Sequence, residues 1–289
     1  MKALVFFEMK DGSPAGASLE LISAAAAIGA EATAVCVAEA DGVIYEDTVT
    51  DAITKKADGF DVILFAATQI GKLVTPRIAA RLGGASVNDA IGLKVEDGKI
   101  IVTRPVFGGT ALENLQIQAS PAVISVRGGS FAAPETAPEA EALDNATESK
   151  TKITEVIAEA GEAVNLEDAT IIVAGGRGMG SEEDFGLCKE LADALGGVVG
   201  ATRPAIESGW IPRSHQVGQS GKIVTPDLYI AAGVSGATQH LSGMIGSKYI
   251  VAINKDADAA IFSVADVGIV GDAKKILPLM IEEVKKRNK

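Results

Sequence analysis

The run QVGQSGK, residues 216–222, gathers two glutamines, a serine and a lysine around two glycines. It is too polar to form a buried strand, and it holds too few turn-specific residues to serve only as a turn. Glycines let a backbone approach a ligand closely, while amide and hydroxyl side chains provide donors and acceptors. The run therefore predicts a loop that lines a polar ligand.

Five further segments of the second half combine glycines with polar side chains. They are GGRGMGS (175–181), GATRP (200–204), GVSGATQH (233–240), INKD (253–256) and VGIVGD (267–272). Ligands of open α/β sheets bind beyond the carboxyl ends of the strands, which is where these segments are expected. The first half has no comparable series, so we expect a cofactor to be held mainly by the second half.

Two of these segments offer backbone amides to a phosphate at a helix start. GGRGMG departs from the dinucleotide fingerprint because Ser181 stands where the third glycine belongs, and the acids at 182–184 would repel a pyrophosphate. A tight strand-to-helix turn is the favoured interpretation there. GVSGATQH has no nearby acids, and its small residues let the amides of residues 235–237 converge, which makes it the better anion site.

Three side chains in these segments each allow two interpretations. His240 either points inward to a ligand or caps a turn, and a structural role is the commoner fate of a lone histidine. Arg203 suits an exposed salt bridge, or a place beside a flat aromatic ligand that gains negative charge. Asp272 suits either a ligand contact or the N-cap of a terminal helix.

Composition limits the chemistry. The sequence has no GxSxG, Walker A, HExxH or SxxK motif, and its two histidines and two cysteines leave little for nucleophilic or acid–base catalysis. Cys36 and Cys188 lie far apart among apolar neighbours, so we expect buried hydrophobes and neither zinc nor an iron–sulfur cluster. The second half is therefore predicted to hold a group that does its own chemistry.

Charge and leader signals narrow the class further. A net charge of -12, from 38 acids and 26 bases, disfavours a partner nucleic acid or an anionic membrane. The few thiols fit a reducing compartment, and the start KALVFFE carries no leader pattern. We expect a cytoplasmic protein without stable membrane insertion.

The elements that position these segments are predicted by periodicity. Strands are expected in the first half at 2–8, 32–38 and 61–67, and helices at 18–28, 50–57 and 75–82. Such alternation predicts a parallel sheet with helices on its faces. Asp97-Gly98, between two alternating runs, predicts a hairpin.

An exposed connector is expected at 131–150, where Ala, Pro and Glu dominate, and a short strand at 152–158. A second alternating block follows, with strands at 170–174, 197–201, 228–232 and 249–254 and helices at 181–195 and 274–286. The fold class predicted is α/β, with two open parallel-sheet, doubly wound, Rossmann-like domains. Their boundaries are 1–165 and 166–289.

The second half closely resembles the alpha subunit of electron-transfer flavoprotein. The resemblance is carried by GGRGMGSEEDF, GATRP, QVGQSGKIVTPDLYIAAGVSGATQHLSGM, VAINKDADAAIF and VADVGIVGD, in order and with the family's spacing. It implies a C-terminal domain that binds FAD, a nucleotide-hydrolase-like N-terminal domain that contacts a beta subunit, and electron transfer as the function. The FAD contacts it implies are Arg177, Thr202, Arg203, Val217, Gly218, Gln219, Ser220, Ser235, Gly236, Ala237, Thr238, Gln239, His240, Asn254 and Asp272. The family usually has Thr at position 220 and often Ser at position 202; both exchanges keep a hydroxyl.

The residue chemistry agrees with these implied roles. Reduction puts negative charge on one edge of the flavin, so the Arg203 guanidinium and the His240 imidazole should favour the reduced forms. A charge-assisted hydrogen bond of about 1.5–3 kcal/mol corresponds to roughly 60–130 mV for one electron. The Ser220 hydroxyl suits the flavin N5, Asn254 the phosphates and ribose, and Asp272 an adenosine hydroxyl.

Three functions remain open on the sequence. The first is a non-catalytic carrier between flavin dehydrogenases, such as those that oxidise acyl-CoA, and a membrane quinone oxidoreductase or another acceptor. The second is a bifurcating version in which NADH reduces a second flavin in the beta subunit, a subgroup that the pair Arg203-Pro204 resembles. The third is a stand-alone NAD-dependent enzyme, which a flavin spectrum would reject.

Overall fold

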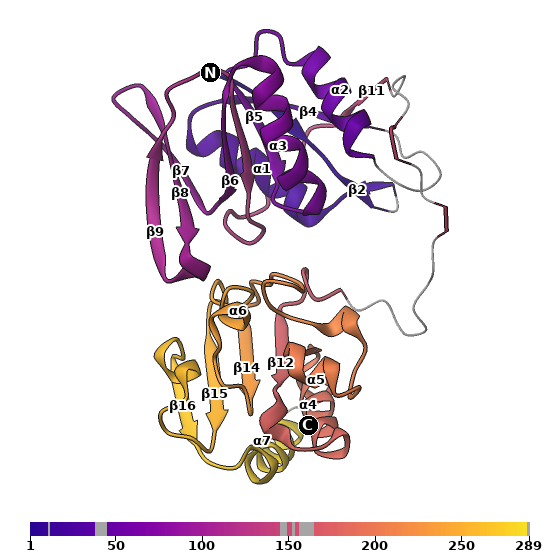
Figure 1. Cartoon of the computed structure of the whole chain (residues 1–289), viewed down its shortest axis with the longest axis vertical. Helices are drawn as coiled ribbons and strands as arrows, with labels where there is room; N and C mark the ends of the chain where they lie inside the picture. The colour runs from indigo at the N-terminus through magenta and orange to yellow at the C-terminus, as the bar shows by residue number, and fades with distance from the viewer. Residues whose placement is uncertain (11, 38–44, 145–148, 152–153, 156–164, 288–289) are drawn as a thin grey trace. The chain divides into compact units, whose positions relative to one another are not determined.

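The computed structural model describes residues 1–10, 12–37, 45–144, 149–151, 154–155 and 165–287. The chain divides into two compact units, residues 1–157 and residues 158–289 (Figure 1). Each unit is built on its own parallel sheet.

Unit 1 has a six-stranded parallel sheet. Its order is β11 (Glu141–Leu143), β4 (Glu31–Val37), β1 (Lys2–Phe6), β5 (Val62–Ala66), β10 (Ala122–Val126) and β6 (Ala85–Ala90). One face packs on α1 (Gly16–Ala27), and the other on α2 (Glu46–Lys56) and α3 (Gln69–Leu82). The central strands are apolar throughout because both faces are covered.

The helices and strands predicted within residues 1–130 are present, but α2 and α3 begin four and six residues earlier than the expected starts at 50 and 75. The start of α2 is polar at Glu46, Asp47 and Thr48, so apolar periodicity does not reveal it. The start of α3 does carry apolar residues at 70, 73 and 74, and the side chain of Thr68 marks it as well, because its hydroxyl accepts a hydrogen bond from the amide of Gly71.

The predicted hairpin is confirmed. Strands β7 (Gly92–Glu96) and β8 (Lys99–Val106) pair antiparallel, and β9 (Ala111–Gln116) extends the ribbon. Asp97 and Gly98 have φ of 48° and 73°, the left-handed pair that a two-residue hairpin turn requires.

Part of the segment 131–150, which we expected to be an exposed connector, forms a strand instead. Residues 141–143 form the edge strand β11, which pairs parallel with β4, and Lys56 Nζ lies 2.7 Å from the Glu141 carboxylate. Three residues, EAL, carry too little pattern to predict a strand. The strand expected at 152–158 falls largely outside the described residues, and residues 154–155 are not in a strand.

Unit 2 has a five-stranded parallel sheet. Its order is β13 (Val198–Ala201), β12 (Ile171–Gly175), β14 (Leu228–Ala232), β15 (Ile250–Asn254) and β16 (Val267–Val270). Helices α4 (Glu182–Leu195) and α7 (Ala273–Arg287) pack on one face, and loop residues such as Val217, Val224 and Met244 cover the other. The α/β fold class and the parallel sheets are as predicted.

Helix α4 is bounded as its sequence predicts. The Ser181 hydroxyl accepts from the amide of Asp184, and Gly196 ends the helix in the left-handed conformation. Cys188 is buried in the predicted apolar stripe, and burial raises the pKa of its thiol to about 12. Cys36 is only partly buried, which corrects the expectation of a second core cysteine.

The edge strand β16 of unit 2 lies in a segment that the sequence did not predict as a strand. The segment expected as a polar loop at 267–272 begins with strand β16, because its valines and isoleucine complete the sheet edge.

Among the described residues, no helix is both long and apolar enough to span a membrane.

Candidate functional site

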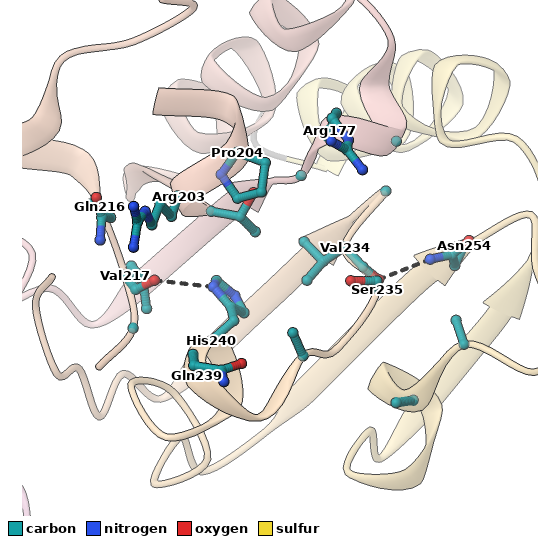
Figure 2. A pocket seen from close by; sticks show the side chains of 18 of the residues that line it. Arg177, Arg203, Pro204, Gln216, Val217, Val234, Ser235, Gln239, His240 and Asn254 are labelled. Carbon is teal, nitrogen blue, oxygen red and sulfur yellow. Dashed lines mark hydrogen bonds between the residues drawn. The ribbon is translucent and has the colours of Figure 1, made fainter. Parts of the chain in front are cut away.

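A cavity of about 920 Å³ opens in unit 2 where the strands of its sheet end (Figure 2). Its walls come from the segments that follow β12, β13, β14 and β15, together with the loop 216–220. The carboxyl ends of neighbouring parallel strands meet at one edge, so segments far apart in sequence converge there. The volume is that of a site for a cofactor-sized ligand.

Close backbone packing forms the floor between two of these segments. A side chain on Gly176 or Gly178 would place its Cβ 2.3 or 2.6 Å from the carbonyl oxygen of Gly233. Gly233 has a φ of 63°, and its carbonyl accepts from the amide of Gly178 at 3.0 Å. These glycines are therefore required by the approach of the two loops, as expected for a tight strand-to-helix turn.

The loop 216–222 is fixed by its own backbone bonds. The amide of Gln219 donates to the carbonyl of Gln239 at 2.7 Å, and Gly218, with φ 139°, packs against that same carbonyl. Gln216 is buried, and its Nε2 donates to the Ser220 Oγ at 2.9 Å. Because the Ser220 oxygen accepts this bond, the hydroxyl proton of Ser220 is available to a ligand.

His240 points into the unit and lines the cavity (Figure 2). Its Nδ1 lies 3.1 Å from the carbonyl oxygen of Val217, and its Nε2 lies 3.0 Å from the Tyr229 hydroxyl. Burial lowers the pKa of His240 to about 4, against a smaller raising effect of the Val217 carbonyl. The imidazole is thus neutral at neutral pH, so the positive charge near a bound ring would come from Arg203 and not from His240.

Arg203 forms the exposed salt bridge that its sequence context allows and also lines the cavity, while its place beside a flat ligand stays a prediction. It lies on the short helix α5 (Arg203–Glu207), lines the cavity, and its Nε is 2.7 Å from Glu207 Oε1. The side chain is 67% exposed, so the pair itself adds little stability. Arg203 is therefore a cation on the cavity wall whose charge is partly offset by Glu207.

Thr202 presents a buried hydroxyl to the cavity. The residue is 7% exposed, and its Oγ1 has no hydrogen-bond partner in the part of the chain that the structure describes. Leaving a buried hydroxyl unpaired costs about 1–3 kcal/mol, so native proteins rarely retain one without a partner. A polar ligand atom in the cavity would remove that cost.

The structure brings most of the predicted contacts into one cavity. Those that line it are Arg177, Thr202, Arg203, Val217, Gly218, Gln219, Ser220, Ser235, Ala237, Gln239, His240 and Asn254.

Three predicted contacts do not line the cavity: Gly236, Thr238 and Asp272. Gly236 has a φ of 84°, and a Cβ there would lie 2.1 Å from the backbone nitrogen of Ile261, so its role is to let two loops meet. Thr238 is the exposed first residue of α6 (Thr238–Leu241). Asp272 Oδ1 accepts from the amide of Lys274 at the start of α7, which is the capping alternative. Its contact with an adenosine hydroxyl stays a prediction.

Several lining residues were missed by sequence reasoning. They are Gly176, Gly178, Pro204, Glu207, Gln216, Gly233, Val234, Asp256, Asp258, Ala259 and Ala260. The glycines, Pro204, Gln216, Val234 and Asp256 stand inside the six polar segments, where spacing could have found them. Glu207 follows Arg203 by four residues, which is the spacing of a helical ion pair.

Asn254 organises the segment after β15 (Figure 2). Its Nδ2 donates to the carbonyl of Val234 at 2.8 Å, and its Oδ1 accepts from the amide of Asp256 at 3.0 Å. Asn254 therefore ties two cavity walls together. The carboxylates of Asp256 and Asp258 lie on the same wall and suit ligand hydroxyls better than phosphates.

Comparisons with known proteins agree with this geometry. Residues 38–160 match the family model of the electron transfer flavoprotein domain, and residues 165–245 match that of the electron transfer flavoprotein FAD-binding domain. The second match includes the segments after β12, β13 and β14 that line the cavity.

Curated relatives match over much of the chain. The electron transfer flavoprotein subunit alpha of Thermoanaerobacterium thermosaccharolyticum is 48% identical over 235 residues, covering 78% of this chain and 71% of that protein. The protein of the same name from Bacillus subtilis is 38% identical over 320 residues, covering 99% and 98%. Protein FixB of Clostridium saccharobutylicum is 42% identical over 250 residues, covering 83% and 74%.

Proposed function

Because the chain belongs to the alpha-subunit family of electron transfer flavoproteins, we propose that its cavity in unit 2 holds FAD and that the chain carries electrons. The subunit name implies a beta subunit and hence a heterodimer. Unit 1 is proposed to contact that subunit. Flavin dehydrogenases, including those that oxidise acyl-CoA, are the proposed donors, and a membrane quinone oxidoreductase is the proposed acceptor.

The convergence of four post-strand segments and the loop 216–220 on one cavity is the observation that carries the proposal. The residues present also suit a flavin nucleotide. Thr202 offers an unpaired buried hydroxyl, and Ser220 has a proton to donate, which suits the flavin N5. The glycines at 176, 178 and 233 let the segments after β12 and β14 meet closely where they line the cavity.

Bound FAD supplies the redox chemistry, because its ring accepts and returns electrons. The chain contributes position and charge. Arg203 places a cation on the cavity wall, Arg177 places a second one, and His240 contributes an uncharged wall whose two ring nitrogens are held by Val217 and Tyr229. The exposed Ser235 and Ala237, before α6, present backbone amides suited to the phosphates. The positive charges of Arg203 and Arg177 favour the reduced, more negative state of the flavin ring over its oxidised state.

The test is to co-express the full chain with its beta subunit, purify the complex, count FAD per heterodimer and add NADH. One FAD and no reaction with NADH identifies a simple carrier, which is the result we expect. Two FAD with rapid reduction by NADH identifies the bifurcating version, whose second flavin would belong to the partner. A complex without flavin would overturn the proposal and revive the stand-alone NAD-dependent enzyme.

A further inference from the structure

Tyr229 is a fully buried tyrosine behind the cavity wall. It lies on β14 and does not line the cavity, yet its hydroxyl is 3.0 Å from the Nε2 of His240, which does. Within the part of the chain that the structure describes, that imidazole is the hydroxyl's partner. Neither sequence motifs nor the cavity lining singled out this residue.

The proton positions in this chain of bonds follow from the chemistry of its ends. The carbonyl of Val217 can only accept, so the Nδ1 of His240, 3.1 Å away, must carry a proton and donate. A neutral imidazole then has a lone pair at Nε2, which accepts, and the Tyr229 hydroxyl must donate to it. The three groups are compatible with one tautomer of the neutral ring.

We propose that Tyr229 is a positioning residue, whose hydroxyl holds His240 as the neutral Nδ1–H tautomer and thereby fastens the loop 216–222 to α6. The loop bond depends on this tautomer, because only a protonated Nδ1 can donate to Val217. The consequence for the cofactor rests on the proposed function. The histidine wall stays uncharged, and Arg203 carries the positive charge near the ring.

The surroundings of His240 agree with a neutral ring. Tyr229 on β14 is the titratable group in contact with it, and the carbonyl of Val217 faces it from the loop. Arg203 and Glu207 face the same cavity from α5 as an ion pair, and Asp256 and Asp258 line it beyond β15. Burial is the larger cause of its lowered pKa. A doubly protonated ring would force the Tyr229 hydroxyl to accept and to find a new acceptor for its own proton.

The test uses the imidazole signals of the full chain labelled with 15N-histidine. The chain has two histidines, His215 and His240, so a His215→Gln variant assigns the spectrum. We expect His240 to show the Nδ1–H tautomer at pH 7 and to stay neutral down to about pH 5. A cationic ring or the Nε2–H tautomer at pH 7 would overturn the proposal, and this part needs no variant of Tyr229.

The matched change is Tyr229→Phe, which removes only the hydroxyl. Loss of a neutral hydrogen bond to the neutral ring should make proton binding by His240 about tenfold tighter and weaken the preference for the Nδ1–H tautomer, which the Val217 carbonyl alone then supports. An unchanged tautomer and titration in a folded Tyr229→Phe chain would contradict the positioning role. The spectra require no FAD, so the proposal survives if the cavity proves to bind another ligand, and it can fail while FAD is bound.

Discussion

The guanidinium of Arg203 stands on the cavity wall with its Nε 2.7 Å from Glu207 Oε1. Arg203→Ala should lower the FAD midpoint potential of the complex by roughly 60 mV, the lower end of the range for a charge-assisted hydrogen bond. The lower end applies because the side chain is 67% exposed and is screened by water. A redox titration measures the shift.

Glu207→Gln is the matched control for that change. Neutralising the carboxylate leaves the Arg203 charge without its partner, so the potential should rise. Equal potentials in wild type and both variants would remove Arg203 from the tuning of the cofactor.

Removing the Thr202 hydroxyl should raise the stability of the flavin-free chain and lower its affinity for FAD. Thr202→Val removes a buried hydroxyl that lacks a partner among the described residues. We expect the free energy of unfolding of the flavin-free chain to rise by about 1 kcal/mol, while FAD affinity falls about tenfold. Denaturant titration and flavin fluorescence measure the two effects, with Thr202→Ser as the variant that keeps the hydroxyl. Destabilisation of the flavin-free chain would show that the hydroxyl serves the fold.

At the scale of residues, the sequence identifies the segments that contain the site more reliably than it identifies the role of each side chain there. Thr202, Arg203 and Ser220 stand in polar, glycine-containing segments and were found. The neutral state of His240 was not, because it depends on burial in the folded unit, beside Tyr229 and Val217, which are distant in the sequence. Pairing between distant strands leaves no local pattern in the sequence.

The next scale is that of the elements that His240 joins, β14, α6 and the loop 216–222. The pKa of His240 is about 4 in the folded chain, below its ordinary value of 6.5. The unfolded chain therefore binds more protons between these values, and stability falls as pH drops from 6.5 towards 4. The loss is roughly 3 kcal/mol and is absent above pH 6.5.

Denaturant midpoints at pH 7.5 and pH 4.5 measure this loss. His240→Gln should flatten the pH dependence, whereas His215→Gln should keep it. A His240→Gln chain that still loses the same stability would assign the effect to carboxylates elsewhere.

A strong hydrophobic pattern predicts that an element exists, whereas short elements with a weak pattern are missed. The buried strands β1, β5 and β14 are continuous apolar runs and lie where the sequence predicts them. The edge strands β11 and β16 were missed because they are short and open to solvent, so neither burial nor alternation marks them. Their strand state comes from pairing with β4 and β15.

The whole molecule holds its proposed chemistry in one unit. Both units contain parallel sheets with their own apolar cores, but the cavity with glycine-lined walls belongs to unit 2. The match of residues 165–245 to the FAD-binding domain model falls in the same unit. The contact with the beta subunit is therefore proposed for unit 1.

Filling the cavity tests most directly whether it is the FAD site. Ala260 is exposed and lines the cavity, and Ala257 is exposed in the same segment without lining it. Tryptophan at either position therefore changes the same surface, but only Ala260→Trp occupies the cavity. We expect the co-purified heterodimer to lose one FAD per alpha chain in Ala260→Trp and to keep its full flavin content in Ala257→Trp. Full flavin content in a folded Ala260→Trp heterodimer would contradict the assignment of FAD to this cavity.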